Sequence, residues 1–274
     1  MAPTDNRMDG VLQLGPLMLA TDRAIAVALL WAFVAIGGML AHRYDIRAAK
    51  TAWLALVSGI VAARVGFIAS NFSAFRDDPW SMLYLWQGGF SWWLGVATAA
   101  LVIVVTLGRS RAGLALLGTT AALAGVNGAA TLLLAADPRP LPAGIALSTL
   151  DGVSTSLDAE RGQPMVINLW ATWCPPCRRE MPMLIDVAAG STVPLLLANQ
   201  GENAARIRAY LRQENLPEQA IRLDAGGALA AATGSSALPT TLFIDGAGRI
   251  RKTHAGEISR AALTAAIRDL ERNP

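Results

Sequence analysis

Residues 165–182 read Met-Val-Ile-Asn-Leu-Trp-Ala-Thr-Trp-Cys-Pro-Pro-Cys-Arg-Arg-Glu-Met-Pro, and this stretch decides the fold of the second half of the chain. Residues 165–170 form a short apolar run rich in side chains that favour β-structure, which predicts a buried strand. A helix is expected to follow over about residues 176–189. The two cysteines, Cys174 and Cys177, therefore lie where a buried strand ends and a helix begins.

This placement suits the cysteine pair to redox chemistry. The free N–H groups and the dipole at a helix N-terminus favour negative charge, so a thiolate there is stabilised and can attack a disulfide. The spacing brings the second sulfur within bonding reach, and we expect Cys174 to be exposed and Cys177 to be covered. The alternatives are a structural disulfide or half of a metal site. The Trp before the motif and the prolines inside it favour redox activity.

The chain has two cysteines and two histidines. These numbers exclude a scaffold of several disulfides and an all-cysteine zinc site, and no Cys-x-x-Cys-His motif for covalent haem occurs. We expect no metal and no cofactor besides the cysteine pair. The net charge of +3 is small and scattered, so nucleic acid is not an expected partner.

The rest of the second half alternates expected strands and helices. The strands are expected at 193–198, 221–223, 241–245 and 250–254, and the helices at 202–213, 228–232 and 258–272. A βαβ unit followed by a hairpin and a closing helix predicts an α/β sandwich. Prolines at 138, 140 and 142 predict a stiff linker over residues 136–142. The second domain is thus expected over residues 143–274.

The first half, residues 1–135, has the composition of a membrane domain. The whole chain is 53% apolar, and its charged fraction of 16% is below the roughly 25% of soluble domains. Charged residues are sparse before residue 138. Apolar segments at about 24–41, 51–72, 90–107 and 114–135 approach the roughly 20 residues that a spanning helix needs. Four such segments in succession favour a multi-pass helical domain of about four helices over buried helices of a soluble core.

Basic residues indicate the orientation of these helices. Arg43, Arg47 and Lys50 lie in the first loop, and Arg109 and Arg111 lie in the third. We expect these short loops on the cytoplasmic side, with the N-terminus and the second half outside, which in a bacterium is the periplasm. The residues before the first segment lack the basic start of a signal peptide, so we expect that segment to be a retained helix.

Arg64 interrupts the second apolar segment. A charge at the centre of a membrane helix costs about 2.5–3.5 kcal/mol on insertion scales and usually marks a site. Two interpretations stay open. Arg64 either contacts a lipid headgroup, or it snorkels or bonds to neighbouring carbonyl groups.

Residues 166–182, the run Leu238-Pro-Thr-Thr-Leu-Phe-Ile-Asp245 and His254-Ala-Gly256 resemble the thioredoxin superfamily, in particular the TlpA-like thiol–disulfide reductases. The resemblance covers about residues 143–272 and implies a thioredoxin-like α/β fold. It implies that Cys174 attacks, that Cys177 resolves the mixed disulfide, and that Pro239 is a cis-proline facing the disulfide. The carbonyl of Leu238 would then be presented to the substrate backbone, and Trp173 is expected to contact substrate as well.

The same resemblance implies a functional carboxylate at Glu180. The alternative is that Glu180 complements the helix dipole, and we favour proton handling. Many thioredoxins carry a buried Asp six residues before the first Cys. Asn168 stands there in this chain, so we expect Glu180 to substitute for that base.

The two prolines of the motif bear on the direction of electron flow. Pro175 and Pro176 lack N–H groups, so two donors that could point at the Cys174 sulfur are missing. Oxidants of this superfamily have a strongly stabilised thiolate. A less stabilised thiolate predicts a reductant.

A second resemblance covers about residues 10–130. Residues 59–67, Pro79, the run 85–91 (Leu-Trp-Gln-Gly-Gly-Phe-Ser) and Gly15-Pro16 resemble prolipoprotein diacylglyceryl transferase. That family has a functional His where Trp93 stands here, and its later Gly-Arg-x-x-Asn stretch has no counterpart in residues 124–130. We therefore expect a truncated and degenerate membrane domain, with Arg64 as a candidate lipid-contacting residue and no transferase chemistry.

These observations together predict a membrane-anchored thiol–disulfide oxidoreductase that reduces protein disulfides in the periplasm, in a multi-pass protein of a bacterial inner membrane. The membrane half has no cysteine, so a separate membrane protein with its own thiols is the expected electron donor. Membrane lipids and disulfide-bonded proteins are the other expected partners. Apocytochrome c, copper-chaperone thiols and misoxidised proteins all stay open as substrates. The alternatives are a membrane protein related to the transferase and a scaffold whose helices recruit a partner.

Overall fold

The computed structural model describes residues 11–14, 17–75, 79–84, 88–133, 137–160, 162–235 and 237–272. The chain divides into two compact units. One contains residues 10–85 and 89–135, and the other is formed mainly by residues 136–274. The division falls at the start of the segment that the prolines predict as a linker.

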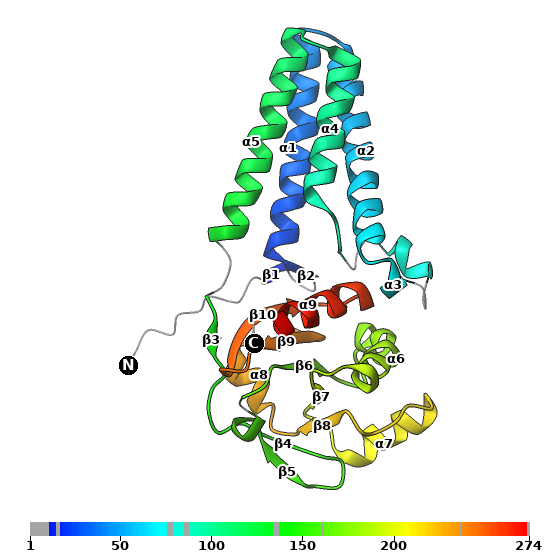
Figure 1. The fold of residues 1–274 in the computed structure, drawn as a ribbon, viewed down its shortest axis with the longest axis vertical. Helices are drawn as coiled ribbons and strands as arrows, with labels where there is room; N and C mark the ends of the chain where they lie inside the picture. The colour runs from blue at the N-terminus through cyan, green and yellow to red at the C-terminus, as the bar shows by residue number, and fades with distance from the viewer. Residues whose placement is uncertain are drawn as a thin grey trace. The chain divides into compact units, whose positions relative to one another are not determined.

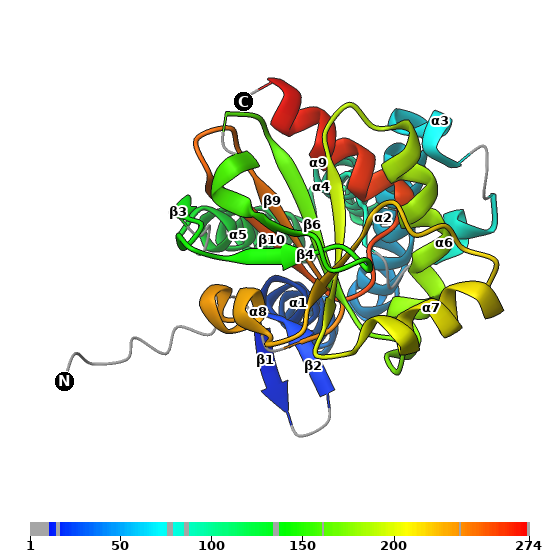
Figure 2. The same cartoon turned by 90° about the horizontal axis from the view of Figure 1, so that it is seen from below.

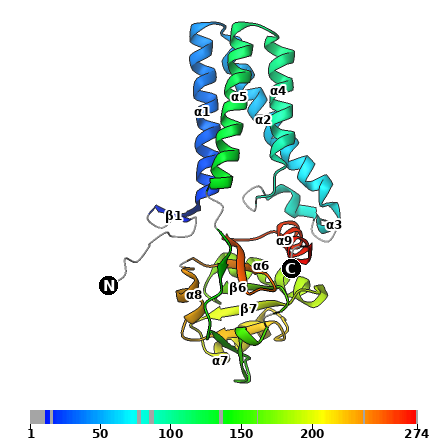
Figure 3. The same cartoon turned by 60° about the vertical axis from the view of Figure 1, so that its left-hand side comes forward.

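The first unit is a bundle of long helices that run side by side (Figures 1 and 3). A short hairpin of two strands precedes the bundle, and two short helices lie between its second and third long helices. The hairpin was not expected from the sequence. The elements are β1 (Val11–Leu14), β2 (Leu17–Ala20), α1 (Thr21–Arg43), α2 (Arg47–Ser70), α3 (Phe72–Phe75), the 3-10 helix η1 (Pro79–Leu83), α4 (Trp92–Leu107) and α5 (Arg111–Leu133).

Three of the described helices are long and apolar enough to cross a membrane: Ala24–Arg43, Arg47–Ser70 and Arg111–Leu133. The helix α4 is strongly apolar but has 16 residues. At 1.5 Å per residue it is about 24 Å long, against a hydrocarbon core of about 30 Å. Each of the four expected segments thus corresponds to a helix in the described residues, and the third is shorter than a typical span.

Small residues allow α2 and α4 to approach closely. A Cβ atom on Gly95 would lie 3.0 Å from the carbonyl oxygen of Gly59 and 3.1 Å from Cβ of Ala63. Helices in a membrane associate through such close van der Waals packing, because lipid provides no hydrophobic drive between them. The buried core of the bundle consists of Phe33, Ala48, Ala52, Ala55, Ala99, Ile103, Leu107, Ala112 and Leu116.

The second unit is built on an eight-stranded sheet with the order β3-β10-β9-β6-β7-β8-β4-β5. The strands β6, β7 and β8 are parallel, and the other pairings are antiparallel. The central strand β6 is buried along its whole length. The strands are β3 (Arg139–Pro140), β4 (Ala146–Ser148), β5 (Ser154–Ser156), β6 (Met165–Trp170), β7 (Leu195–Gln200), β8 (Ile221–Asp224), β9 (Thr240–Ile244) and β10 (Arg249–Ala255).

Helices cover both faces of this sheet. The helices α6 (Pro175–Gly190), α7 (Ala204–Gln213) and α9 (Arg260–Arg272) lie on one face, and α8 (Ala228–Thr233) lies on the other (Figure 2). Side chains of β6 alternate between the two cores. Val166 and Trp170 face α6, whereas Ile167 and Leu169 belong to the core under α8. The expected α/β sandwich is confirmed, with β3, β4, β5 and the 3-10 helix η3 (Leu157–Glu160) added to the elements expected from the sequence.

The segment 136–142 is not a free linker along its whole length. Residues 139 and 140 form β3, which pairs with β10 at the edge of the sheet. The N–H of Leu141 donates to the carbonyl of Gly248 at 2.8 Å, and the Leu141 side chain is buried. Its prolines do not prevent this, because they lie at an edge strand where a missing N–H costs no ladder bond. The expected domain boundary at residue 143 is therefore a few residues too late.

Some of the sequence predictions fall outside the described residues. Among them are Gly15-Pro16 and residues 85–87, which carried much of the transferase resemblance, and residues 134–136, where the fourth expected segment ends and the expected linker begins.

Candidate active site

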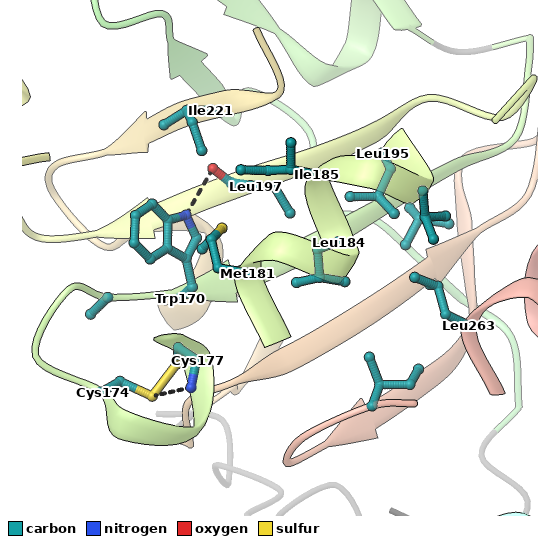
Figure 4. Packing of buried hydrophobic residues seen from close by; sticks show 14 of the residues in the cluster. Trp170, Cys174, Cys177, Met181, Leu184, Ile185, Leu195, Leu197, Ile221 and Leu263 are labelled. Atoms are coloured by element: carbon teal, nitrogen blue, oxygen red, sulfur yellow. Dashed lines mark hydrogen bonds between the residues drawn. A yellow bond between two sulfur atoms is a disulfide. The ribbon is translucent and has the colours of Figure 1, made fainter. Parts of the chain in front are cut away.

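Cys174 and Cys177 are joined by a disulfide at the junction of β6 and α6 (Figure 4). Cys174 is the N-cap residue of α6. Its sulfur accepts a hydrogen bond from the N–H of Cys177 at 3.3 Å, and its carbonyl accepts from the N–H of Arg178 at 3.1 Å. The described donor to this sulfur thus comes from the third residue after it. The two residues between, Pro175 and Pro176, have no N–H to offer.

The expected exposure of Cys174 is wrong for this oxidised form. Cys174 is 3% exposed and Cys177 is fully buried. The reason is packing, because both cysteines belong to the apolar cluster that includes Trp170 and Met181 (Figure 4). The indole N–H of Trp170 donates to the carbonyl of Leu197 at 3.1 Å, which fixes the ring beneath the pair. Trp173, directly before the pair, is 62% exposed.

The peptide bond between Leu238 and Pro239 is cis, as the resemblance implied. Pro239 precedes β9, and the register pairs Thr240 of β9 with Leu169 of β6. The end of β6 that leads to Cys174 and the start of β9 therefore lie at the same edge of the sheet. The carbonyl of Pro239 accepts from the N–H of Gly256 at 2.8 Å, which ties this turn to the segment after β10.

Glu180 is a buried carboxyl group, with 3% of its surface exposed. Its Oε1 accepts from Nδ2 of Asn168 at 3.0 Å, and its Oε2 accepts from the N–H of Ile258 at 2.9 Å. Burial raises the pKa of Glu180 from 4.5 to about 8, against these two hydrogen bonds, which lower it. Nearby Glu257 adds to the rise and Arg179 opposes it. A group with such a pKa can take up or release a proton near neutral pH.

A second buried carboxylate holds the loop before Cys174. The N–H and hydroxyl of Thr172 donate to Glu202 at 2.7 and 2.6 Å, and Nδ2 of Asn199 donates at 2.8 Å. Burial alone would raise the pKa of Glu202, but these bonds and the charge of Arg206 lower it overall. The sequence pattern places Glu202 at the start of the helix expected over residues 202–213. The signal that could have found it is its place directly after β7, since the carboxyl ends of parallel strands share one edge of a sheet.

Other polar side chains near the site lie in structural contacts. Arg178 pairs with Glu214 at 2.8 Å, and Arg179 pairs with Glu257 at 2.8 Å, both on the surface. The His254 ring is hydrogen-bonded to the carbonyl of Glu257. Among the described residues, no group of His, Cys, Asp and Glu could hold a metal ion.

Arg64, in the first unit, is 5% exposed and bonds to backbone carbonyls. Its guanidinium donates to Met82 at 3.0 Å, Ser81 at 2.9 Å and Gly89 at 3.1 Å. It also lies over the rings of Phe75 and Phe90. The sequence left two interpretations of Arg64 open. The described contacts match the one in which Arg64 bonds to neighbouring carbonyl groups. Trp93 is 61% exposed at the start of α4.

Comparison with known proteins identifies the family of this chain. The Redoxin family profile matches residues 136–267. A thiol:disulfide interchange protein DsbE homolog of Paracoccus denitrificans is 36% identical over 154 residues, which are 53% of this chain and 84% of that protein. The chain belongs to the DsbE family. The thiol-disulfide oxidoreductase ResA of Geobacillus thermodenitrificans is 32% identical over 117 residues, which are 42% of this chain and 67% of ResA. A solved structure of MTB dsbF is similar with a TM-score of 0.44 and 25% identity, over 48% of this chain and 98% of dsbF.

The DsbE-family chain is a thiol–disulfide oxidoreductase, and its second half has the thioredoxin-like fold. Thiol–disulfide proteins with this fold exchange disulfides through a cysteine pair and need no external cofactor. The pair is present as Cys174 and Cys177.

Proposed function

We propose that this DsbE-family chain is a membrane-anchored reductase of protein disulfides, with its redox domain in the periplasm of a bacterium. The observation that carries the proposal is the Cys174–Cys177 disulfide at the N-terminus of α6, beside a buried carboxyl group. The helix N-terminus stabilises the attacking thiolate, and the carboxyl group can exchange a proton with the thiols.

The reaction starts from the reduced pair. The Cys174 thiolate attacks a substrate disulfide, which forms a mixed disulfide and releases one substrate thiolate. The Cys177 thiol then loses its proton, and its thiolate attacks the sulfur of Cys174. The second substrate thiolate leaves, and two electrons have passed to the substrate. Two protons follow, one for each substrate thiolate, and the pair is left as a disulfide.

Glu180 is the proposed proton acceptor for Cys177. The two residues are three apart on α6 and so lie on one side of the helix. With its pKa raised to about 8, the ionised Glu180 is a stronger base than an ordinary carboxylate, and a fraction of it is ionised at neutral pH and able to accept the proton. This role is the one that the resemblance implied for Glu180.

The substrate-binding surface is proposed at Trp173, Leu238 and Pro239. Trp173 is exposed next to Cys174 and provides a large apolar contact. Leu238 and Pro239 lie at the edge of the sheet that carries the cysteine loop. The carbonyl of Leu238 can accept a backbone N–H of an extended substrate, as in strand addition.

The direction is proposed from the two prolines of the motif. Among the described contacts, one backbone N–H, that of Cys177, donates to the Cys174 sulfur. A thiolate with few donors is less stabilised, so the reduced pair gives up its electrons more readily. This favours a reductant over an oxidant.

The membrane half is proposed as an anchor with four crossings, the short loops after α1 and α4 facing the cytoplasm. Arg43, Arg47, Lys50, Arg109 and Arg111 in and beside these loops support this orientation. Residues 1–173 contain no cysteine, so a separate membrane protein with its own thiols is proposed to reduce the Cys174–Cys177 disulfide. Membrane lipids surround the helices.

Diacylglyceryl transfer is not part of the proposal, although the resemblance of residues 10–130 raised it. Trp93 stands where the transferase family has its His. In its described hydrogen bonds, the guanidinium of Arg64 donates to backbone carbonyls. A catalytic site needs its groups fixed together, and these positions provide none. Residual phospholipid binding that Arg64→Ala weakens would indicate that the membrane half retains a lipid contact.

Trapping of the mixed disulfide tests the proposed function. The reduced full-length protein is mixed with a disulfide-bonded protein such as insulin, and the products are separated without reductant. Cys177→Ser should accumulate a covalent complex through Cys174, because the resolving thiol is absent, and Cys174→Ser should not. A complex that forms equally well with Cys174→Ser would contradict the assigned order of attack.

A further inference from the structure

Asn168 and Glu180 lie on opposite sides of Cys174 in the sequence, each six residues from it, and the fold brings them into contact. Nδ2 of Asn168 lies 3.0 Å from Oε1 of Glu180. Both side chains are buried, with 0% and 3% of their surfaces exposed. Asn168 shares its face of β6 with Val166 and Trp170, the face that packs against α6.

In the described hydrogen bonds of Glu180, both carboxyl oxygens are acceptors. Asn168 donates to Oε1, and the N–H of Ile258 donates to Oε2 at 2.9 Å. The same amide nitrogen of Asn168 donates to Oγ1 of Thr241 at 3.0 Å. Its Oδ1 has no hydrogen-bond partner among the described residues. A buried carbonyl without a partner costs free energy, so the two N–H contacts hold the amide in this orientation against that cost.

The charged groups around Glu180 do not replace these donors. Arg179, on the same helix, favours the carboxylate, and Glu257, from the segment before α9, disfavours it. These two side chains pair with each other at 2.8 Å, so their effects on Glu180 oppose one another. Asn168 from β6 and the Ile258 N–H are the groups that directly support ionisation of a carboxyl group that burial disfavours.

We propose that Asn168 is a positioning residue for proton transfer, whose amide allows the buried Glu180 to exchange its proton under the conditions in which the thiols react. The proposal rests on the proposed role of Glu180. Because Asn168 is neutral, the contact holds a single ionisable group. An acid at position 168 would put two carboxyl groups about 3 Å apart, and such a pair resists the second ionisation strongly. An apolar side chain there would leave Glu180 with one donor fewer.

The contact also allows the two side chains to exchange roles. In the double variant N168D/E180Q, the new amide at position 180 can donate to the new carboxylate at position 168. Its oxygen can still accept from the N–H of Ile258, and the hydroxyl of Thr241 can donate to the carboxylate. A role of Asn168 in packing alone gives no reason why moving the acid from the helix to the strand should restore activity.

The test measures the rate of exchange between the reduced full-length protein in detergent and oxidised glutathione, from about pH 6 to about pH 10. Ionisation of the Cys174 thiol by itself makes the rate rise with pH. Beyond that rise, the wild type should show a second one that E180Q removes. In N168D this rise should move upward by about one pH unit or more, with a several-fold slower rate at neutral pH, and N168L should move it in the same direction. In the double variant, the rate should rise at a pH close to that of the wild type. The rate itself should be within a few-fold of the wild-type rate.

Two results would overturn the proposal. One is that the rate of exchange in N168D and N168L rises at a pH within about 0.3 units of the pH at which it rises in the wild type. The other is a folded double variant that is as slow as N168D or E180Q alone. If N168D does not fold, N168L and the double variant decide by the same criteria. Failure of the proposed function looks different, because then E180Q has the wild-type profile, or the wild type does not exchange at all.

Discussion

At the scale of the residue, the fold strongly changes the protonation of Glu180. Its pKa rises from 4.5 to about 8, so the folded protein binds a proton that the unfolded chain releases between these values. The bound proton adds to the free energy of unfolding. This contribution is complete below about pH 4.5 and is lost as the pH rises through about 8. Burial is the cause, and it makes the carboxyl group a proton carrier at the expense of stability in mild base.

Glu180→Gln should therefore remove this pH dependence. Relative to the variant, the wild type should become less stable as the pH rises from about 5 to about 9, and the variant should exchange disulfides several-fold more slowly. Amide hydrogen exchange of β6 and α6 in the full-length protein, compared at each pH, measures the stability difference. Glu214→Gln, which also removes one carboxylate but on the surface, is the matched control. A Glu180→Gln protein that unfolds outright would make Glu180 a structural residue.

Glu202 shows the opposite shift, because its hydrogen bonds favour the charged form. Its pKa is lowered, so its contribution to stability is present above its ordinary pKa near 4.5 and is lost as the pH falls through the lowered value. Glu202→Gln should cost about 1–3 kcal/mol at neutral pH, since Thr172 and Asn199 lose good acceptor partners. Faster hydrogen exchange at Thr172 and Trp173 would report the loosened loop. Unchanged protection there would show that Glu202 does not hold it.

At the scale of the element, the strand β3 makes the start of the redox domain part of its sheet. A fragment of residues 138–274 keeps the pairing of β3 with β10 and the buried Leu141, and a fragment of residues 143–274 loses both. The shorter fragment should be less stable by about 2–4 kcal/mol, from one buried Leu and the lost hydrogen bonds. Urea unfolding of the two fragments measures the difference. Equal stabilities would mean that residues 138–142 act as a linker after all.

The crossing of α2 and α4 depends on glycine. Gly95→Leu should force the helices apart, because a Cβ atom at that position meets Gly59 and Ala63 at 3.0 and 3.1 Å. Gly118→Leu is the matched control, since a Cβ atom there meets nothing within 4 Å. Thermal aggregation of the purified protein in detergent should begin at a lower temperature for Gly95→Leu alone. The same onset for both variants would contradict the close packing.

Sequence reasoning succeeded where one local pattern controls the structure. The apolar run before Cys174 and the amphipathic pattern of α9 predicted their elements to within a few residues. The strands β4 and β5 were missed because they are three residues long and carry Ser and Thr, which give little hydrophobic signal. The burial of Cys174 and the contact of Asn168 with Glu180 depend on packing between elements distant in the sequence. No pattern within one element contains that information.

At the scale of the whole molecule, the chain combines a redox domain with a membrane half that we expect to carry no electrons. The protein alone in vesicles, with reductant inside and a disulfide substrate outside, should give no reduction outside. The reason is that the membrane half has no cysteine to relay electrons. Adding dithiothreitol outside should start turnover and serves as the control. Turnover driven from inside would refute a passive anchor.

The central claim is that Cys174 and Cys177 form a reducing pair, and the reduction potential of this pair in the full-length protein tests it most directly. Equilibration with glutathione or dithiothreitol buffers, followed by alkylation and mass spectrometry, gives the potential. The account predicts a value below about −200 mV, because the Cys174 thiolate has few donors to stabilise it. A value of about −120 mV, as in strong oxidants of this fold, would contradict the assignment of a reducing pair.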